Sequence, residues 1–260
     1  MLAAVIYGLI VGVALGLTGG GGSIFAVPLL IYGLGVPMGT AAGLSLAAVG
    51  LTAGFGASLR RHELEWRAGL VFAAAGMALA PAGAALGRLL NPALVLSAFA
   101  LLMGYVGWRM WAGQSGDALA TGPCFARGNG KLQSGCYARL LGAGAAAGAL
   151  SGVFGVGGGF IIVPALVFVT GMAIHRAVAT SLLVIFLISL SGVAAHLLNG
   201  ADFPLQLSAL FVGGGCAGML TGSRLRTRIS PSRLRQVFAA AMWLVGAYML
   251  WRNVPALFHL

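Results

Sequence analysis

Two glycine runs inside apolar sequence contain the residues whose types and spacing best suit binding chemistry. The first run is Gly19, Gly20, Gly21 and Gly22, followed by Ser23, and the second is Gly155, Gly157, Gly158 and Gly159. A helix that begins after such a break presents the positive end of its dipole, and glycine lets a ligand approach the backbone closely. Both features favour an anion, and the Ser23 hydroxyl can cap the helix or bind the ligand. The alternative is that the glycines only permit tight helix packing, but their occurrence in two matching places favours a binding site.

Four polar side chains elsewhere in apolar sequence are further candidates for contacting the same ligand: Ser45, Thr180, Ser181 and Arg176. Each hydroxyl either lines the pathway or bonds to a carbonyl of its own helix. Arg176 stands at the start of an apolar segment, where it either attracts an anion or anchors the segment at the membrane interface. The predicted substrate-binding set therefore comprises these four residues, the glycines and Ser23.

The acidic residues all fall in expected loops: Glu63, Glu65, Asp117 and Asp202. A carboxylate inside the membrane is the usual ligand or relay in cation and proton transport, so this placement argues against cation transport. Backbone carbonyls can still hold Na⁺, so H⁺ and Na⁺ both remain open as coupling ions.

No pattern of residues points to catalysis, a cofactor or a metal. The spacing of the three cysteines matches no metal motif, and free thiols are expected. Ser151 and His196 form the one nucleophile and base pair worth naming for an intramembrane hydrolase, and no motif surrounds them. We therefore expect no catalytic residue, no cofactor and no metal site.

The composition is that of an integral membrane protein. The 260 residues are 60% hydrophobic and 7% charged, with a mean hydropathy of +1.00, which lies outside the range of soluble domains. Residues 1–18 resemble a retained membrane segment more than a signal peptide, because no basic region precedes the apolar run. The net charge of +11 falls in short loops, as in membrane proteins with basic cytoplasmic loops. We expect a lipid bilayer and no nucleic acid as partners, with the oligomeric state open.

The two glycine runs belong to an internal repeat. Residues 16–30 (GLTGGGGSIFAVPLL) align without a gap with residues 152–166 (GVFGVGGGFIIVPAL), and the register continues to Ser45 and Ser181. The expected apolar segments are 2–18, 23–34, 38–59, 68–90 and 92–112 in the first half, and 139–154, 159–170, 174–198, 204–223 and 236–255 in the second. The second segment of each half, at about 1.5 Å per residue, covers only about half of a bilayer core. We predict a first transmembrane repeat at 1–112, a connecting loop at 113–137 and a second repeat at 138–260.

Arginine placement predicts that the two repeats have opposite orientations. Residues 60–67, the connecting loop and residues 224–235 are basic and should be cytoplasmic, whereas residues 199–204 carry an acid and no base. Because 60–67 and 199–204 occupy equivalent places in the halves, the halves are inverted, with periplasmic termini and a cytoplasmic connecting loop. The predicted fold is an all-α integral membrane protein of two inverted-topology repeats. Each repeat has about five segments and a glycine-broken, re-entrant or half-length helix hairpin.

The repeated pattern G-x-x-G-x-G-G, followed after five residues by Pro28 or Pro164, resembles the signature of the sulfite exporter TauE/SafE family, also called the toluene sulfonate uptake permease family. The resemblance covers essentially the whole chain. It implies a prokaryotic inner-membrane permease whose typical substrates are sulfite, sulfonates and related sulfur-containing anions. The second run has Val156 where the first has Gly20, so the two half-sites differ chemically.

The function expected from the residues and the resemblance together is secondary transport of a small sulfur-containing anion such as sulfite, thiosulfate or an organosulfonate. Export across the inner membrane, by alternating access around a midplane site at the glycine breaks, is the expected mode. The alternatives are a permease for another small solute or a metal ion, and a membrane scaffold that transports nothing.

Overall fold

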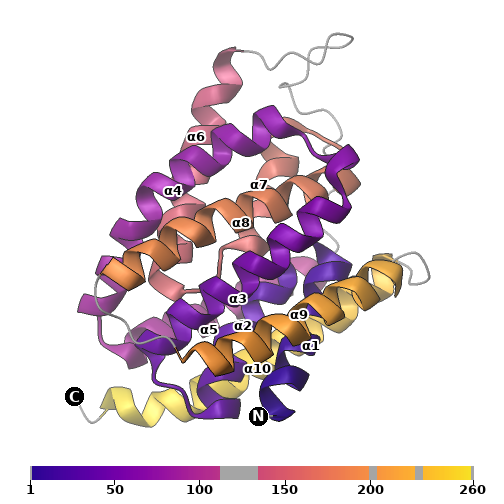
Figure 1. The fold of residues 1–260 in the computed structure, drawn as a ribbon. Coiled ribbons are helices and arrows are strands. Elements are labelled where there is room, and N and C mark those ends of the chain that lie inside the picture. Colours follow the sequence, from indigo (N-terminus) through magenta and orange to yellow (C-terminus); the bar gives the residue numbers. More distant parts are fainter. Residues whose placement is uncertain (1, 112–133, 199–203, 226–230, 259–260) are drawn as a thin grey trace.

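Helices form all the regular structure of the described residues, which are 2–111, 134–198, 204–225 and 231–258 of a computed structural model (Figure 1). The elements of the first half are α1 (Leu2–Thr18), η1 (Gly21–Phe25), α2 (Ala26–Pro28), η2 (Leu29–Gly33), α3 (Met38–Leu59), η3 (Arg61–Glu63), α4 (Trp66–Leu89) and α5 (Pro92–Trp111). Those of the second half are α6 (Ser134–Phe154), α7 (Gly159–Thr170), α8 (Ile174–Leu198), α9 (Leu205–Leu225) and α10 (Pro231–Phe258). The prediction of an all-α protein is confirmed.

The long and short elements follow the predicted order in both halves. Within the described ranges, four helices (α3, α4, α8 and α9) are long and apolar enough to cross a membrane by length and composition. The short segment after each glycine run is present, but the two differ in regularity. Residues 21–33 form a 3-10 turn, one short α turn and a π turn, whereas α7 is a continuous α-helix with Pro164 inside it. Pro28, which has no N–H to donate, ends the short α turn of the first segment.

Each short segment folds back against the helix before it. A Cβ added at Gly22 would lie 2.3 Å from the backbone nitrogen of Leu15, and one at Gly33 would lie 2.5 Å from the ring of Tyr7. The 21–33 segment therefore runs antiparallel to α1, and we call the pair the first hairpin. Similarly, a Cβ at Gly158 would lie 3.1 Å from the carbonyl oxygen of Ala147 in α6, and α6 with α7 forms the second hairpin. The glycine runs are the tips of the two hairpins.

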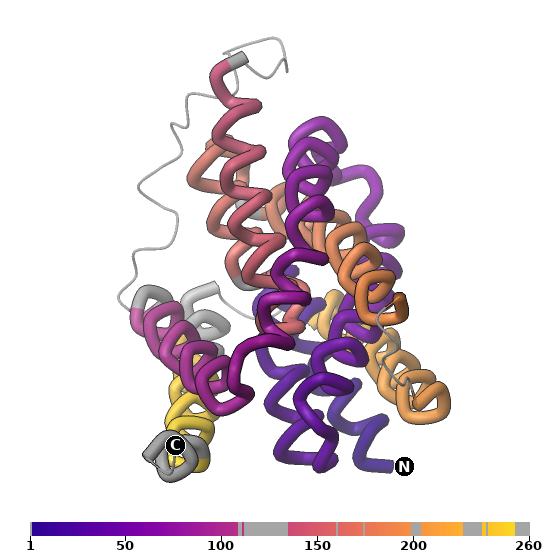
Figure 2. The backbone as a smooth tube through the Cα atoms, turned by 90° about the vertical axis from the view of Figure 1, so that its left-hand side faces the viewer, coloured from indigo at the N-terminus to yellow at the C-terminus, as the bar shows by residue number. Residues whose placement is uncertain are grey.

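The first helix of each hairpin packs against the helix that forms the fourth segment of the other half. α1 lies against α9, and α6 lies against α4 (Figure 2). The glycines bring the backbones into contact: a Cβ at Gly12 would lie 2.0 Å from the carbonyl oxygen of Gly215, and one at Gly148 would lie 2.2 Å from that of Gly76. In each pair, the residue numbers of the contacting positions rise together along both helices, so the two helices are parallel. Neither half buries its own hairpin alone.

The third helices of the two halves cross at the centre of the bundle. α3 packs against α8 (Figure 1), with Gly50 opposite Ser189 and Gly56 opposite Leu182. Since residue numbers rise along one helix as they fall along the other, α3 and α8 are antiparallel. The helices of the fifth segments, α5 and α10, also pack antiparallel. The Trp243 indole N–H donates to the Gly104 carbonyl oxygen at 3.1 Å.

Two of the three cysteines lie within described residues. Cys216 in α9 is a free thiol, as expected. Cys136, near the start of α6, takes part in a disulfide, so the expectation of a free thiol is wrong at that position.

Candidate functional site

The tips of the two hairpins touch inside the helix bundle. A Cβ at Gly20 would lie 2.1 Å from the carbonyl oxygen of Gly159, and one at Gly159 would lie 2.7 Å from that of Gly20. The same position at Gly159 lies 2.6 Å from the side chain of Ile185, near the middle of α8. Gly20 and Gly159 are both buried. Backbone contact between these segments therefore requires glycine on both sides.

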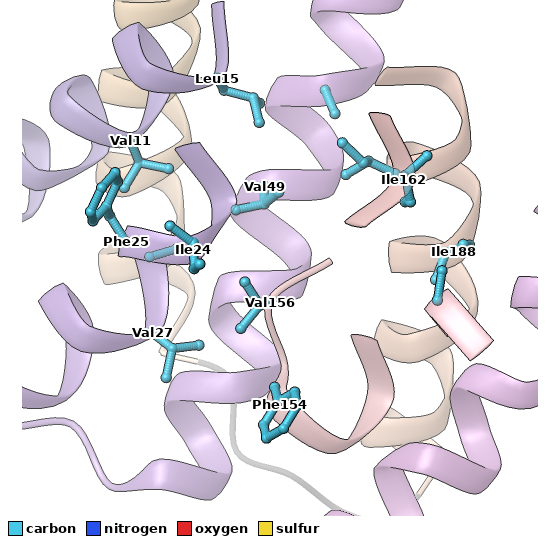
Figure 3. Close-up of a cluster of buried hydrophobic side chains, with 14 of the residues drawn as sticks. Val11, Leu15, Ile24, Phe25, Val27, Val49, Phe154, Val156, Ile162 and Ile188 are labelled. Atoms are coloured by element: carbon cyan, nitrogen blue, oxygen red, sulfur yellow. The ribbon is translucent and has the colours of Figure 1, made fainter. Parts of the chain in front are cut away.

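Apolar side chains of both hairpins gather around the tips. Ile24 of the first hairpin and Val156 of the second lie close to Val49 of α3 (Figure 3), and all three are buried in one apolar cluster. Polar groups at the tips are consequently held away from water, where each hydrogen bond and each fixed dipole acts more strongly.

The hydroxyl groups of Thr18 and Ser23 at the first tip form hydrogen bonds with backbone groups of the first hairpin. Thr18 Oγ1 donates to the Ala14 carbonyl oxygen and accepts from the N–H of Gly21. Ser23 Oγ donates to the carbonyl oxygen of Gly20 at 2.8 Å. The Ser23 hydroxyl thus closes the turn, which is the capping alternative for this residue, and the segment that follows is not a regular α-helix.

Ser181 of α8 also bonds to the first tip. Its hydroxyl lies 2.9 Å from the carbonyl oxygen of Gly19 and 2.8 Å from that of Val178 in its own helix. Gly19 has a φ of +76°, a left-handed conformation that favours glycine. Of the two alternatives for Ser181, bonding to its own helix is present, together with a bond that crosses to the glycine run.

The second tip has a different geometry. Gly155, Gly157 and Gly158 all have positive φ, at +67°, +70° and +64°. Gly158 is the N-cap of α7 and its carbonyl oxygen accepts from the N–H groups of Ile161 and Ile162. The continuous α-helix that follows points the positive end of its dipole at the tip, so the α7 N-terminus is the one that suits an anion.

Three buried serines on helices that pack at the second tip have hydroxyls with no hydrogen-bond partner among the described residues: Ser45, Ser151 and Ser189. Ser189 Oγ lies 3.2 Å from the Cβ position of Gly157, and Ser151 Cβ lies 3.2 Å from that of Gly158. Burying a hydroxyl without a partner costs about 1–3 kcal/mol. The second tip therefore combines a helix N-terminus with unsatisfied polar groups.

Two predicted site residues lie elsewhere. Arg176, at the start of α8, has a side chain that is 55% exposed and forms an ion pair with Glu65. Thr180 Oγ1 accepts a hydrogen bond from the backbone N–H of Glu65 at 3.0 Å. Both residues tie the start of α8 to the segment before α4, and the structure does not bring either of them to the glycine tips.

Ser151, Ser189 and Arg60 lie at the hairpins, although none of them belongs to the substrate-binding set predicted from the sequence. The Arg60 guanidinium donates to the carbonyl oxygen of Gly16 at 2.9 Å, and so holds the C-terminal end of α1 to the end of α3. Ser189 follows Ser181 at a spacing of eight residues, with Ile185 halfway between them. A spacing of four on a helix keeps residues on one face, and this signal would have identified Ser189.

The cavity between the first hairpin and α10 is distinct from the tips. Its volume is about 530 Å³, and its lining is apolar side chains of α1, the 21–33 segment and α10, including Leu17, Phe25 and Val245. None of the three unpartnered serines lines it. Among the described residues, no group of His, Cys, Asp and Glu is arranged to hold a metal ion.

Comparisons with known proteins identify the family of the chain and the general type of protein. The family model described as Sulfite exporter TauE/SafE matches residues 4–249. A probable membrane transporter protein of Xylella fastidiosa strain 9a5c is 37% identical over 257 residues, which is 95% of this chain and 94% of the relative. The probable membrane transporter protein YdhB of Bacillus subtilis is 30% identical over 251 residues, which is 92% of this chain and 94% of the relative.

No solved structure matches the chain. The family match spans nearly all of the sequence, and the relatives with near full-length coverage are described as membrane transporters. The protein is therefore a multi-pass membrane transporter rather than an enzyme, and the chain belongs to the sulfite exporter TauE/SafE family.

Proposed function

We propose that this chain is a secondary permease that exports a small sulfur-containing anion, such as sulfite, thiosulfate or an organosulfonate, across the inner membrane by alternating access. The observation that carries the proposal is the contact of the two hairpin tips inside the bundle, Gly20 against Gly159, beside the N-terminus of α7. Broken helices that meet at membrane depth are the usual site of substrate binding in secondary transporters. The family description supports the sulfur-containing substrate and the direction.

The proposed architecture is a pair of inverted repeats. Equivalent helices of the two halves, α3 with α8 and α5 with α10, pack antiparallel. The contact of α1 with α9 is repeated as the contact of α6 with α4. If each hairpin returns to the face it entered from, the three helices that follow cross the membrane, and an odd number of crossings inverts the second half.

The proposed orientation follows from the arginines. Arg60 at the end of α3 and Arg176 at the start of α8 lie at the same end of the bundle, because α3 and α8 pack antiparallel. Glu65 contacts both Arg176 and Thr180 at this end. We place this end and the connecting loop in the cytoplasm, and both termini in the periplasm, in accordance with the positive-inside rule.

Charge favours an anion over a cation at the tips. The two acids that lie within described residues are Glu63 of η3 and Glu65, the N-cap of α4, and both lie at the proposed cytoplasmic end rather than at the tips. The α7 N-terminus supplies positive potential in an apolar setting. H⁺ and Na⁺ both remain candidates for the coupling ion.

The first experiment is a thermal-shift screen of the purified chain in detergent, with sulfite, thiosulfate, sulfate, taurine, sulfoacetate, simple carboxylates and divalent metal ions as probes. Counterflow of the best probe in proteoliposomes then tests transport. A ligand that binds only the native state raises the melting temperature by mass action. We expect stabilisation by one or more sulfur-containing anions and counterflow of the same anion.

Two results would contradict the proposal. Stabilisation and flux with metal ions alone would identify a metal permease. Folded protein that shows neither stabilisation nor flux with any probe would favour a scaffold that uses its glycines only for packing.

A further inference from the structure

Three of the four buried hydroxyls that have no partner among the described residues belong to helices that pack at the second glycine tip. Ser45, Ser151 and Ser189 are each at most 1% exposed, and none of them has a hydrogen-bond partner among the described residues. They come from three different helices, α3, α6 and α8. A buried hydroxyl without a partner is unfavourable in an apolar environment, so a group that binds there would relieve that cost.

Ser151 and Ser189 lie against the second tip, and Ser45 lies on the face of α3 that packs against it. Ser189 Oγ lies 3.2 Å from the Cβ position of Gly157, and Ser151 Cβ lies 3.2 Å from that of Gly158. Ser45 lies on α3 between two residues that touch the same run, Ala42 against Gly155 and Val49 against Gly157. Residues three and four apart share a helix face, so Ser45 faces the run as well.

The first tip shows what a satisfied arrangement looks like. Ser181, the repeat equivalent of Ser45, donates to the carbonyl oxygen of Gly19, and Ser23 donates to that of Gly20. The first tip is followed by a 3-10 turn rather than by a regular α-helix. Its hydroxyls are thus used by the backbone, whereas those around the second tip are available.

We infer that the ligand is held at the second tip alone, with the hydroxyls of Ser45, Ser151 and Ser189 donating hydrogen bonds to the oxygens of a small oxyanion at the N-terminus of α7. Three donors from three directions suit an anion with several oxygens on one central atom, such as sulfite, sulfate or thiosulfate. The first tip closes the site through the backbone contact of Gly20 with Gly159.

The charge at the second tip distinguishes an oxyanion from a sodium ion. Hydroxyl oxygens can coordinate Na⁺, but no Asp or Glu among the described residues lies at either tip to balance a cation. The N-terminus of α7 adds positive potential, which opposes a cation and stabilises an anion. Hydroxyls that donate to a charged oxygen make the stronger class of hydrogen bond.

This inference rests on the proposed anion transport, and the test separates the two. The variants are Ser151→Ala, Ser189→Ala and the double variant, each in the full chain. Ser97→Ala is the matched control, because Ser97 is also buried and has no partner within the described part of the chain, but lies on α5, which contributes to neither hairpin. The probes are sulfite, sulfate and thiosulfate, each as the sodium and the choline salt, read by thermal shift and proteoliposome counterflow.

We expect each single variant to weaken binding of the anion that stabilises the wild type by about tenfold or more, the usual loss for one hydrogen bond to a charged group. The double variant should lose the thermal shift entirely. The melting temperature without ligand should be unchanged or higher in both single variants, because each removes a buried polar group that has no partner. Ser97→Ala should bind as the wild type does.

Other outcomes overturn the inference in distinguishable ways. Wild-type binding in the double variant would remove the second tip from the site but leave anion transport standing. A stabilisation that follows sodium rather than the anion, and is lost in the variants, would make the cluster a sodium site. If no anion stabilises the wild-type protein or is transported by it in proteoliposomes, the proposed function fails and the inference fails with it.

Discussion

Two serines at equivalent places in the repeat show how the residues of the tips differ. The single O–H of Ser181 is shared between the carbonyl oxygens of Gly19 and Val178, whereas Ser45 has no partner within the described part of the chain. The sequence aligned these residues but could not reveal the difference, because the hydrogen bonds depend on the path of the backbone at each tip. Gly20 in one run and Val156 in the other are the residues that mark the asymmetry in the sequence.

The two serines should therefore respond differently to removal of the hydroxyl. Ser181→Ala should lower the free energy of unfolding by about 0.5–1.5 kcal/mol, since it removes hydrogen bonds that are made in the absence of ligand. Ser45→Ala should be neutral or slightly stabilising without ligand. Thermal or denaturant unfolding in detergent measures both values, and equal losses in the two variants would contradict the difference described here.

Arg60 is expected to stabilise the first hairpin. Arg60→Gln should lower the unfolding free energy by about 1.5–3 kcal/mol, the range for a hydrogen bond to a charged group, with the lower end favoured because the side chain is only half-buried. Arg61→Gln is the control, since Arg61 is exposed and hydrogen-bonds to the neighbouring His62. The measurement is the melting temperature of each variant. An equal decrease for both substitutions would show that the loss of a positive charge, and not the bond to Gly16, lowers the stability.

At the scale of elements, glycines hold the parallel helix pairs in backbone contact. Gly214 of α9 faces α1, where a Cβ would lie 2.3 Å from the carbonyl oxygen of Val5, but at the neighbouring Gly213 a Cβ would meet nothing within 4 Å. In α6, Gly148 faces α4 in the same way, and Gly142 has open space. The chain thus offers a matched control within each helix.

Leucine substitutions should separate these positions. Gly214→Leu and Gly148→Leu should abolish or strongly reduce the yield of monodisperse protein, because the added side chain must push two backbones apart. Gly213→Leu and Gly142→Leu should leave the yield near that of the wild type. Size-exclusion chromatography of the solubilised protein gives the comparison. Equal yields for all four would mean that the pairs do not pack as described.

The elements were largely predictable because apolar length and glycine breaks are strong signals. The ranges 38–59 and 159–170 were expected in the places where α3 and α7 lie. The irregular 21–33 segment was not predicted, since a 3-10 turn and a π turn depend on local bonding around Pro28 rather than on composition. The roles of Arg176 and Thr180 were also beyond the sequence, because Glu65 is distant from both in the chain.

For the whole molecule, the proposed orientation can be checked from the two ends of α4. In a cysteine-free background, a membrane-impermeant maleimide applied to intact cells should label Leu89→Cys but not Glu63→Cys, whereas both should react after lysis. Both native residues are exposed. Labelling of Glu63→Cys alone would reverse the orientation, and labelling of both in intact cells would show that α4 does not cross the membrane.

The exchange of helices between the halves has a consequence for how the chain is made. Translation proceeds at about 5–20 residues per second. About 190 residues separate α1 from α9, so α1 is in the bilayer for roughly ten seconds or more before α9 is synthesised and can pack against its glycines. By contrast, α4 is synthesised before α6, so the partner of α6 is already in the bilayer when α6 is inserted. The N-terminal helix is therefore the part of the nascent protein that depends most on the insertion machinery or on lipid for protection. A ribosome that stalls before α9 would leave α1 without the helix it packs against.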